Sequence, residues 1–136
     1  MIKKNKIMVF GTFDGLHKGH LSFFRQAKKY GNNLIAVIAR SSTVKAQKGR
    51  LPLFSEKMRL EALKHVKIIS RARLGHRIDH CRVIWQEKPD IICLGYDQKI
   101  SPRLEKQIRK LGVNIVRLKS YKPEIYKSSL FRKSQK

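Results

Sequence analysis

Ten residues near the N-terminus, from Gly11 to His20, read GTFDGLHKGH and directly follow the short apolar run KIMVF. His17 and His20 lie three positions apart, so at the start of a helix their side chains can face the same side. Gly19 between them would let the backbone approach a phosphate without a side chain in the way. The N–H groups at a helix N-terminus favour an anion. The spacing therefore predicts a phosphate site.

The chemistry available to two such imidazoles is stabilisation of a transition state. Both can donate hydrogen bonds to oxygens whose charge grows as a phosphorus centre is attacked. The segment matches neither the P-loop spacing nor the dinucleotide fingerprint. Two other interpretations remain open at this point. The histidines could ligate a metal, with Asp14 as the one nearby third ligand. Alternatively, the segment could be a structural corner made by Gly11 and Gly15.

The elements that must position these residues are short apolar runs separated by segments with helical spacing. The runs are KIMVFGTF, NLIAVIAR, VKIIS, DIICLGY and NIVRLK. Continuous apolar runs are typical of strands buried on both faces of a parallel sheet. Among the helical segments, SPRLEKQIRKLG begins with Ser101 as N-cap and Pro102 at the first helical position, and ends on Gly112. We expect an α/β fold, a Rossmann-like open parallel sheet of about five strands with helices on both faces, forming a single domain over 1–136.

One polar stretch, SSTVKAQKGRLPLF, follows the second predicted strand and is broken by Gly49 and Pro52. It is predicted to be a long loop. In open α/β sheets, ligands bind in loops at the carboxyl ends of strands. This loop therefore belongs to the expected site.

Composition limits the classes of partner and the compartment. Lys and Arg number 32 against 9 Asp and Glu, a formal net charge of +23. This charge favours nucleic acid, an anionic membrane surface or small phosphorylated substrates as partners. Alternatively, most of the charged side chains simply lie on solvated helix faces. Cys81 and Cys93 form no C-x-x-C pair and are expected to be small buried hydrophobes in a reducing compartment. The absence of a signal peptide and of a membrane-length apolar run predicts a soluble, cytoplasmic protein with no membrane partner.

Three segments together carry a family resemblance. GTFDGLHKGH resembles the signature of the cytidylyltransferase-like nucleotidyltransferases, whose motif is H-x-G-H. KPDIICLGYDQ resembles the fourth-strand segment of that family, and YKSS, residues 126–129, resembles its C-terminal serine motif. With VIARSSTVKAQKGRLPLF, these segments are most similar to the small archaeal-type FAD synthases, which transfer a nucleotidyl group from ATP to FMN. Glycerol-3-phosphate cytidylyltransferase is a near relative.

The resemblance implies a nucleotidyltransferase that moves a nucleotidyl group from an NTP to a phosphate-bearing acceptor and releases pyrophosphate. FMN adenylyltransferase (FAD synthase) activity is favoured, and glycerol-3-phosphate cytidylyltransferase activity is the alternative. Mg²⁺ is expected as cofactor, bound mainly through the NTP phosphates. The implied catalytic residues are His17, His20 and Lys45. The implied nucleotide-binding residues are Thr12, Phe13, His17, Lys18, Gly19, His20, Asp97, Tyr121, Ser128 and Ser129.

Several alternatives stay open within this interpretation. Lys45 could be a solvated lysine, Asp97 a capping residue, and the two serines ordinary N-caps. Relatives carry an arginine in the helix after the basic loop; Arg59 is the candidate, at a shorter spacing to the next Val. A flavin ring needs an apolar slot, for which the candidates are Trp85, Tyr96, Phe54 and Tyr126.

The choice between ATP and CTP, and between FMN and glycerol 3-phosphate, is not fixed by the sequence. A homodimer is one state found in this family, and the oligomeric state stays open. A hypothesis of another class is a basic nucleic-acid-binding module on a nucleotidyltransferase-like fold. Against it, the basic residues are spread along the chain, and neither an aromatic RNA-binding signature nor a zinc-finger spacing is present.

Overall fold

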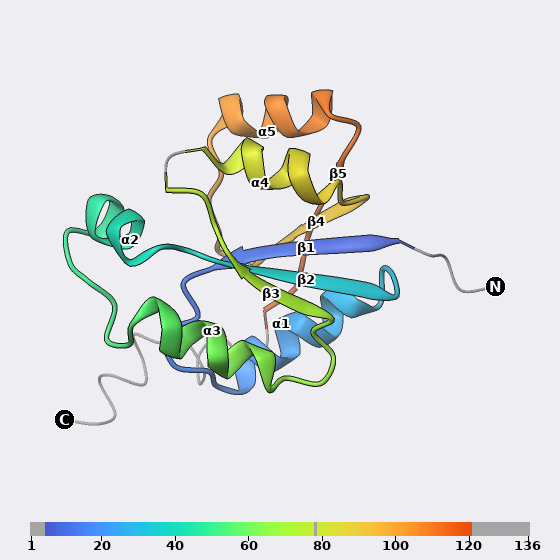
Figure 1. Ribbon diagram of the computed structural model, residues 1–136. Helices are drawn as coiled ribbons and strands as arrows, with labels where there is room; N and C mark the ends of the chain where they lie inside the picture. The colour runs from blue at the N-terminus through green and yellow to red at the C-terminus, as the bar shows by residue number, and fades with distance from the viewer. Residues whose placement is uncertain (1–4, 78, 121–136) are drawn as a thin grey trace.

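Five parallel strands form one sheet in the order β3-β2-β1-β4-β5. The computed structural model describes residues 5–77 and 79–120 (Figure 1). The strands are β1 Lys6–Gly11, β2 Asn33–Ile38, β3 Arg71–Leu74, β4 Ile91–Leu94 and β5 Asn114–Arg117. All four neighbouring pairs are parallel, as the continuous apolar runs predicted. The expected Rossmann-like sheet is confirmed.

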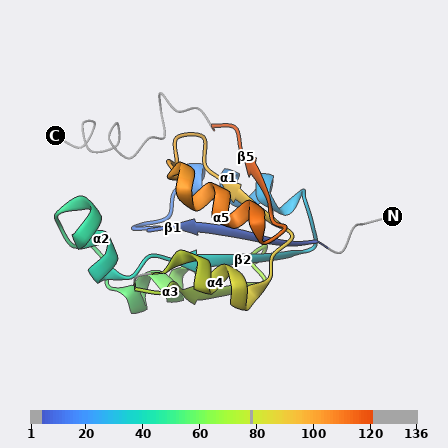
Figure 2. The same ribbon diagram turned by 90° about the horizontal axis from the view of Figure 1, so that it is seen from above.

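Helices cover both faces of this sheet. They are α1 Lys18–Lys28, α2 Ser41–Lys48, α3 Glu56–Lys64, α4 His80–Glu87 and α5 Pro102–Lys110. In Figures 1 and 2, α1 and α3 lie on one face, and α4 and α5 lie on the other. The remaining helix, α2, lies beyond the carboxyl ends of the strands. It therefore belongs to the edge of the sheet at which ligands bind in such folds.

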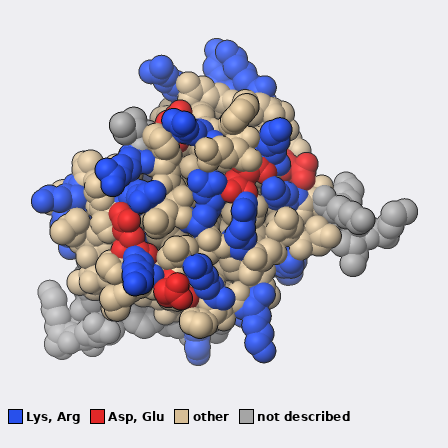
Figure 3. All heavy atoms as spheres, in the orientation of Figure 1, with Lys and Arg blue, Asp and Glu red and all other residues tan. Residues whose placement is uncertain are grey.

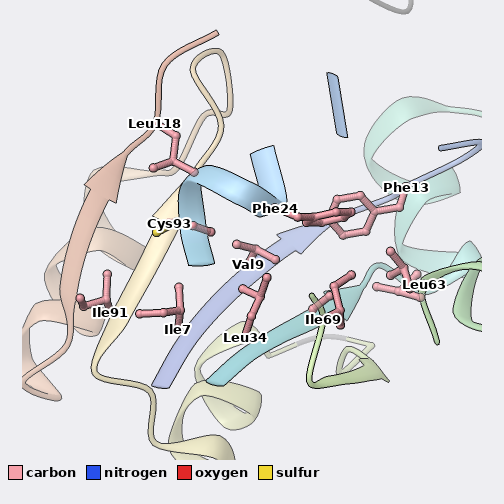
Figure 4. Close-up of a cluster of buried hydrophobic side chains, with 13 residues drawn as sticks. Ile7, Val9, Phe13, Phe24, Leu34, Leu63, Ile69, Ile91, Cys93 and Leu118 are labelled. Carbon is pink, nitrogen blue, oxygen red and sulfur yellow. The ribbon is translucent and has the colours of Figure 1, made fainter. Parts of the chain in front are cut away.

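The side chains of β1 pack into two apolar clusters, one on each face of the sheet. Ile7 and Val9 point toward the α1 and α3 face, where they join Phe24 in a fully buried cluster (Figure 4). Met8 points to the opposite face and packs with Val83 of α4. Successive strand residues face opposite sides of a sheet, so a strand buried on both sides has to be apolar throughout. The two clusters hold the carboxyl end of β1 rigidly in the middle of the sheet.

The strand order reverses at β1, a position where open α/β sheets are expected to have a ligand crevice. The chain runs from β1 outward to β2 and β3, then returns to the other side of β1 to form β4 and β5. A crevice outside the carboxyl ends of two strands at such a reversal is the usual ligand site of open α/β sheets. It lies between the segment after Gly11 and the loop after Leu94.

The third strand differs from the prediction. The predicted segment VKIIS, residues 66–70, is a loop, and β3 begins immediately after it. Ser70 guides the chain into the sheet, because its N–H donates to the Leu34 carbonyl at 2.8 Å and its Oγ accepts the Leu34 N–H at 3.1 Å. β3 is an edge strand in which Arg71 and Arg73 alternate with apolar residues. Its pattern is therefore the alternation of a strand with one polar face.

The predicted long loop after β2 is also partly wrong, because residues 41–48 form α2. Val44 anchors this helix in the core. Gly49 ends it in the left-handed conformation with φ 78°, and its N–H donates to the Lys45 carbonyl at 2.8 Å. Glycine adopts this conformation at little cost, which explains its place at the helix end. Only residues 49–55 remain as loop before α3.

The predicted caps of α5 are confirmed. The Oγ of Ser101 accepts the N–H of Leu104 at 3.1 Å, with Pro102 in the first turn, and Gly112 follows the helix with φ 80°. Of the two cysteines, only Cys93 is fully buried, and burial raises its pKa to about 12. Cys81 is half-buried and donates to the Gln107 side chain at 3.5 Å, so its expected full burial is wrong.

On the face shown in Figure 3, Lys and Arg side chains are spread widely, with Asp and Glu side chains between them. A search of the described helices finds none with the length and apolar character needed to span a bilayer.

Candidate active site

The two histidines cap the N-terminus of α1 together. The Nδ1 of His17 accepts the N–H of Gly19 at 3.0 Å, and the backbone N–H of His17 donates to the Nδ1 of His20 at 3.2 Å. This is the reciprocal arrangement of a capping box, made here by two imidazoles. The ring centroids lie 3.9 Å apart with 34° between the planes. Both rings are therefore fixed in orientation by the backbone.

These contacts determine where the imidazole protons lie. Since each Nδ1 accepts a hydrogen bond, a neutral ring carries its proton on Nε2. Burial lowers the pKa of His17, and burial together with the neighbouring His17 lowers the pKa of His20 to about 4. At neutral pH both rings are accordingly neutral, with Nε2–H as a donor. Such a pair suits phosphate oxygens.

Asp14, the third ligand that the metal interpretation requires, is engaged elsewhere. Its two carboxylate oxygens accept the backbone N–H groups of Leu53 at 2.7 Å and of Phe54 at 2.9 Å. Across residues 5–77 and 79–120, no cluster of three His, Cys, Asp or Glu side chains could hold a metal ion. The aspartate of the G-T-F-D segment thus fastens the loop between α2 and α3 to the carboxyl end of β1.

Phe13 supports the histidines from the core. Its side chain is only 6% exposed, and its ring lies 5.2 Å from that of Phe24 (Figure 4). The ring of His20 lies 5.7 Å from that of Phe13. A Cβ on Gly11 would come within 2.7 Å of the Phe13 ring, so a side chain there would displace it. The family resemblance implies that Phe13 meets the nucleotide. The structure places its ring beside His20 in the core, almost fully buried.

Arg59 joins the segments that surround the histidines. Its side chain is 2% exposed, and its Nη1 donates to the carbonyls of Thr12 at 3.0 Å and Ala39 at 2.7 Å. Its Nε donates to the Phe54 carbonyl at 3.1 Å and its Nη2 to the Ser41 hydroxyl at 3.0 Å. Burial lowers the pKa of Arg59, opposed by the nearby carboxylates. One guanidinium therefore links the ends of β1 and β2, the loop before α3 and the start of α2.

The loop after β4 forms the other wall of the crevice, and Gln98 fixes it. The Oε1 of Gln98 accepts the N–H of Gly95 at 3.1 Å, and its Nε2 donates to the Phe10 carbonyl at 3.1 Å. The predicted nucleotide ligand Asp97 is exposed in this loop. The sequence analysis gave Gln98 no role. The available signal was a polar side chain shortly after a buried strand.

A groove lies on the α4 side of the same edge, away from the aromatic residues predicted to hold a ring. Trp85 is 64% exposed and Tyr96 36%, and neither lines the groove; nor does Phe54. The rings of Phe10 and His80 meet there edge to face, with 6.3 Å between centroids. The residues that line the groove are Phe10, Gly11, Val37, Ile38, Ala39, Arg40, Thr43, Gln47, Gly75, His76, His80 and Val83. Apolar walls with a polar rim are typical of small-molecule sites.

The other predicted site residues divide into three groups. Thr12, Lys18 and Gly19 lie at the same corner as the histidines. Lys45 is exposed on α2 rather than in a loop. Tyr121, Tyr126, Ser128 and Ser129 lie outside the described residues. The chain before them is held to α1, because the Gln26 side chain donates to the Lys119 carbonyl at 2.8 Å and accepts its N–H at 3.0 Å.

A parallel sheet whose strand order reverses at β1, and a histidine pair capping the helix after β1, define an α/β protein with a candidate phosphate site at the carboxyl edge of the sheet. The family model for Cytidylyltransferase-like proteins matches residues 8–134. The chain belongs to this family of nucleotidyltransferases.

Similar proteins agree with that assignment. A FAD synthase of Thermoplasma volcanium is 42% identical over 131 residues, which cover 94% of this chain and 92% of the relative. A FAD synthase of Aciduliprofundum boonei is 43% identical over 119 residues, with 85% and 79% covered. Many archaeal relatives therefore share most of the length of this chain.

Two solved structures share the fold. A protein from Thermoplasma volcanium described as a lipopolysaccharide core biosynthesis protein superposes with a TM-score of 0.81 at 42% identity, covering 88% of this chain and 99% of that one. The pantoate-beta-alanine ligase of Francisella tularensis gives a TM-score of 0.59 at 17% identity, covering 87% and 60%. The second likeness concerns the fold alone.

Proposed function

We propose that the protein is an FMN adenylyltransferase. A phosphate oxygen of FMN attacks the α-phosphorus of ATP; the new P–O bond forms as the bond to the bridging oxygen of the β-phosphate breaks, and pyrophosphate leaves. The observation that carries the proposal is the pair of neutral imidazoles, each with its Nδ1 accepting a backbone N–H and its proton on Nε2. The FAD synthases among the relatives support ATP and FMN as the substrates.

This site performs catalysis by alignment and by charge neutralisation. The acceptor phosphate is already an anion at neutral pH, so no strong general base is needed. His17 and His20 donate from Nε2 to the phosphate oxygens on which charge develops. Lys18 at the start of α1 adds positive charge at the same corner. Holding the two phosphates in line supplies the rest of the rate enhancement.

The donor set at this corner fits an NTP phosphate better than a resident metal ion. N–H groups and a lysine bind phosphate oxygens directly. Mg²⁺ would be held by the triphosphate oxygens and water, where it would neutralise charge on the β- and γ-phosphates. Lys45 is proposed to approach the same phosphates from α2.

The small groove between α2 and α4 is proposed to receive one edge of the flavin ring. It reaches Gly11 and Ala39, next to the segment that carries the histidines, and Arg40 contributes a cation to its rim. Glycerol 3-phosphate has no aromatic ring to fill such a groove, so the Phe10 and His80 rings favour FMN as acceptor.

The deciding experiment is a pyrophosphate-release assay that crosses ATP and CTP with FMN and glycerol 3-phosphate. We expect release only with ATP and FMN, together with formation of FAD. Release with CTP and glycerol 3-phosphate would assign the alternative activity. No release with any pair, together with duplex binding that weakens steeply with salt, would assign the nucleic-acid-binding hypothesis.

The histidine roles are tested by His17→Asn and His20→Asn. The Oδ1 of asparagine can replace Nδ1 as the acceptor of the backbone N–H, so the cap of α1 is retained, whereas the Nε2–H donor is lost. We expect a fall in kcat of about 10²-fold or more for each variant with little change in melting temperature. His65→Asn, at the exposed end of α3, is the matched control. Turnover within a few-fold of wild type would disprove these roles.

A further inference from the structure

Arg117, at the end of β5, holds the loop that follows β4. It stands opposite Leu94 in the parallel register of the two strands. Its Nη1 donates to the carbonyls of Gly95 at 2.8 Å and Gln98 at 2.7 Å, and the Tyr96 carbonyl lies 3.5 Å away. A charged donor makes stronger hydrogen bonds than a neutral one. One guanidinium nitrogen therefore turns the carbonyls of the loop toward β5.

Gln98 fastens the same loop on its other side. Its amide joins the Gly95 N–H to the Phe10 carbonyl of β1, so it spans the crevice between β4 and β1. The loop itself closes as a four-residue turn, in which the Gln98 N–H donates to the Gly95 carbonyl at 3.1 Å. The turn is thus tied to β1 by Gln98 and to β5 by Arg117.

These contacts determine which groups of the turn can meet a ligand. The carbonyls of Gly95 and Gln98 accept hydrogen bonds from Arg117 at the end of β5. Asp97, between them, is exposed. A turn fixed before binding avoids the free-energy cost of ordering it in the complex, and the direction of its polar groups discriminates among bases.

We propose that Arg117 is a positioning residue that presets the Gly95–Gln98 turn for the nucleobase and ribose of the NTP, and so sets nucleotide affinity and the preference for ATP over CTP. The proposal rests on the proposed function for the identity of the nucleotide. Arg117 acts through the turn and does not touch the reacting phosphates. Its loss should therefore affect nucleotide binding far more than turnover at saturation.

The test compares Arg117→Met and Arg117→Lys with Arg109→Met, a control at an exposed arginine on α5. For Arg117→Met we expect ATP affinity, measured by calorimetry without FMN, to fall about tenfold, which corresponds to about 1.4 kcal/mol. The ratio of kcat/KM for ATP over CTP should fall, while kcat and the KM for FMN stay within about threefold of wild type. Arg117→Lys should recover part of the affinity, since an ammonium can reach some of the same carbonyls.

Unchanged ATP affinity and an unchanged ATP-to-CTP ratio in Arg117→Met would overturn the proposal. So would a joint change of kcat and of the KM for FMN, which would indicate a general structural effect. If Arg117→Met does not fold, Gln98→Met tests the turn from its other anchor, with the same expected loss of ATP affinity. Absence of FAD formation by wild type would refute the proposed function, whereas the binding comparison would still decide the role of Arg117.

Discussion

The backbone N–H of His17 donates to the Nδ1 of His20, and the two rings lie in contact at 3.9 Å between centroids. The first histidine of H-x-G-H therefore orients the second through its main chain, while its own ring is oriented by Gly19. The same two rings therefore cap α1 through Nδ1 and present an Nε2–H donor on the opposite side of each ring. Structural and catalytic demands on these residues cannot be separated by substitution with alanine, but they can be separated with asparagine.

Stability should fall as the pH is lowered through the range in which His20 would normally titrate. The pKa of His20 is about 4 in the folded protein against an ordinary 6.5. Between these values the unfolded chain binds more protons, so the free energy of unfolding decreases as pH falls. Urea unfolding of wild type and His20→Asn at pH 7 and at about pH 5 measures this. The variant should lose less stability than wild type, and equal losses would contradict the buried neutral histidine.

Replacing Arg59 with alanine should destabilise the protein by about 3 kcal/mol or more, because three backbone carbonyls and one hydroxyl lose a buried charged donor. Urea unfolding gives the change, and Met58→Ala, at an exposed position on the same helix, is the control. Arg59→Lys should recover only part of the loss, since an ammonium lacks the planar arrangement of donors. A cost below about 1 kcal/mol for Arg59→Ala would show that the segments hold their positions without it.

Among the acidic residues away from the site, Glu87 should be the one whose substitution lowers the free energy of unfolding most. Its carboxylate is 6% exposed and contacts Arg71, Arg73 at 2.7 Å and Lys6 at 3.9 Å. Glu87→Gln leaves these cations without their shared partner and should cost about 3 kcal/mol, measured by urea unfolding, with kcat unchanged. Glu61→Gln, which removes a surface ion pair, should cost less than about 1 kcal/mol. Equal effects of the two changes would rule out the buried cluster as a source of stability.

Gly95 offers a separate test of the nucleotide turn. The φ angle of Gly95 is not positive. A Cβ added at Gly95 would make only ordinary contacts, the nearest with the Gln98 Cβ at 3.8 Å. The fold therefore does not require glycine here, and Gly95→Ala should raise stability by about 0.5 kcal/mol through the unfolded chain. If a nucleotide lies against this backbone, ATP affinity should nevertheless fall. A variant with wild-type ATP affinity would move the nucleotide away from Gly95.

The distributed positive charge should act on the rate of substrate encounter. A net charge of +23 should attract anionic substrates such as ATP and FMN from a distance, and salt screens that attraction. The kcat/KM for both anionic substrates should therefore decrease as NaCl is raised, with little change in kcat. Stable binding of duplex DNA at physiological salt would contradict this account and favour a nucleic-acid partner.

The sequence predicted the sheet because four of its five strands are continuous apolar runs. The prediction is wrong for the remaining strand, β3, which begins at Arg71 and not within residues 66–70. In β3, Arg71 and Arg73 alternate with apolar residues, as is usual for an edge strand paired on one side only. The sequence also does not predict α2, because only Val44 of that helix is buried, so the helix has no apolar stripe. Weakly buried elements leave a weak pattern in the sequence.

The sequence was enough to predict which motif forms the candidate site, but not which atoms contact one another within it. The H-x-G-H spacing predicted that the two histidines come together at the start of a helix, because that contact depends on local order along the chain. The partners of Asp14, Arg59 and Arg117 lie up to 47 positions away, and hydrogen bonds to backbone groups leave no trace in side-chain identity. The sequence therefore offered Asp14 as a possible metal ligand and Arg59 as a family position, but neither their backbone partners nor any role for Arg117.

The central position of β1 has a consequence for biosynthesis. β1 is synthesised well before its partner β4, which begins at Ile91, so one of its edges has no native neighbour until β4 has also been made. An apolar strand with an open edge is prone to pair with other chains until its native partner strand has been synthesised. The nascent protein should therefore depend on early formation of the β1–α1–β2 unit, and on protection of the other edge, before the catalytic crevice can exist at all.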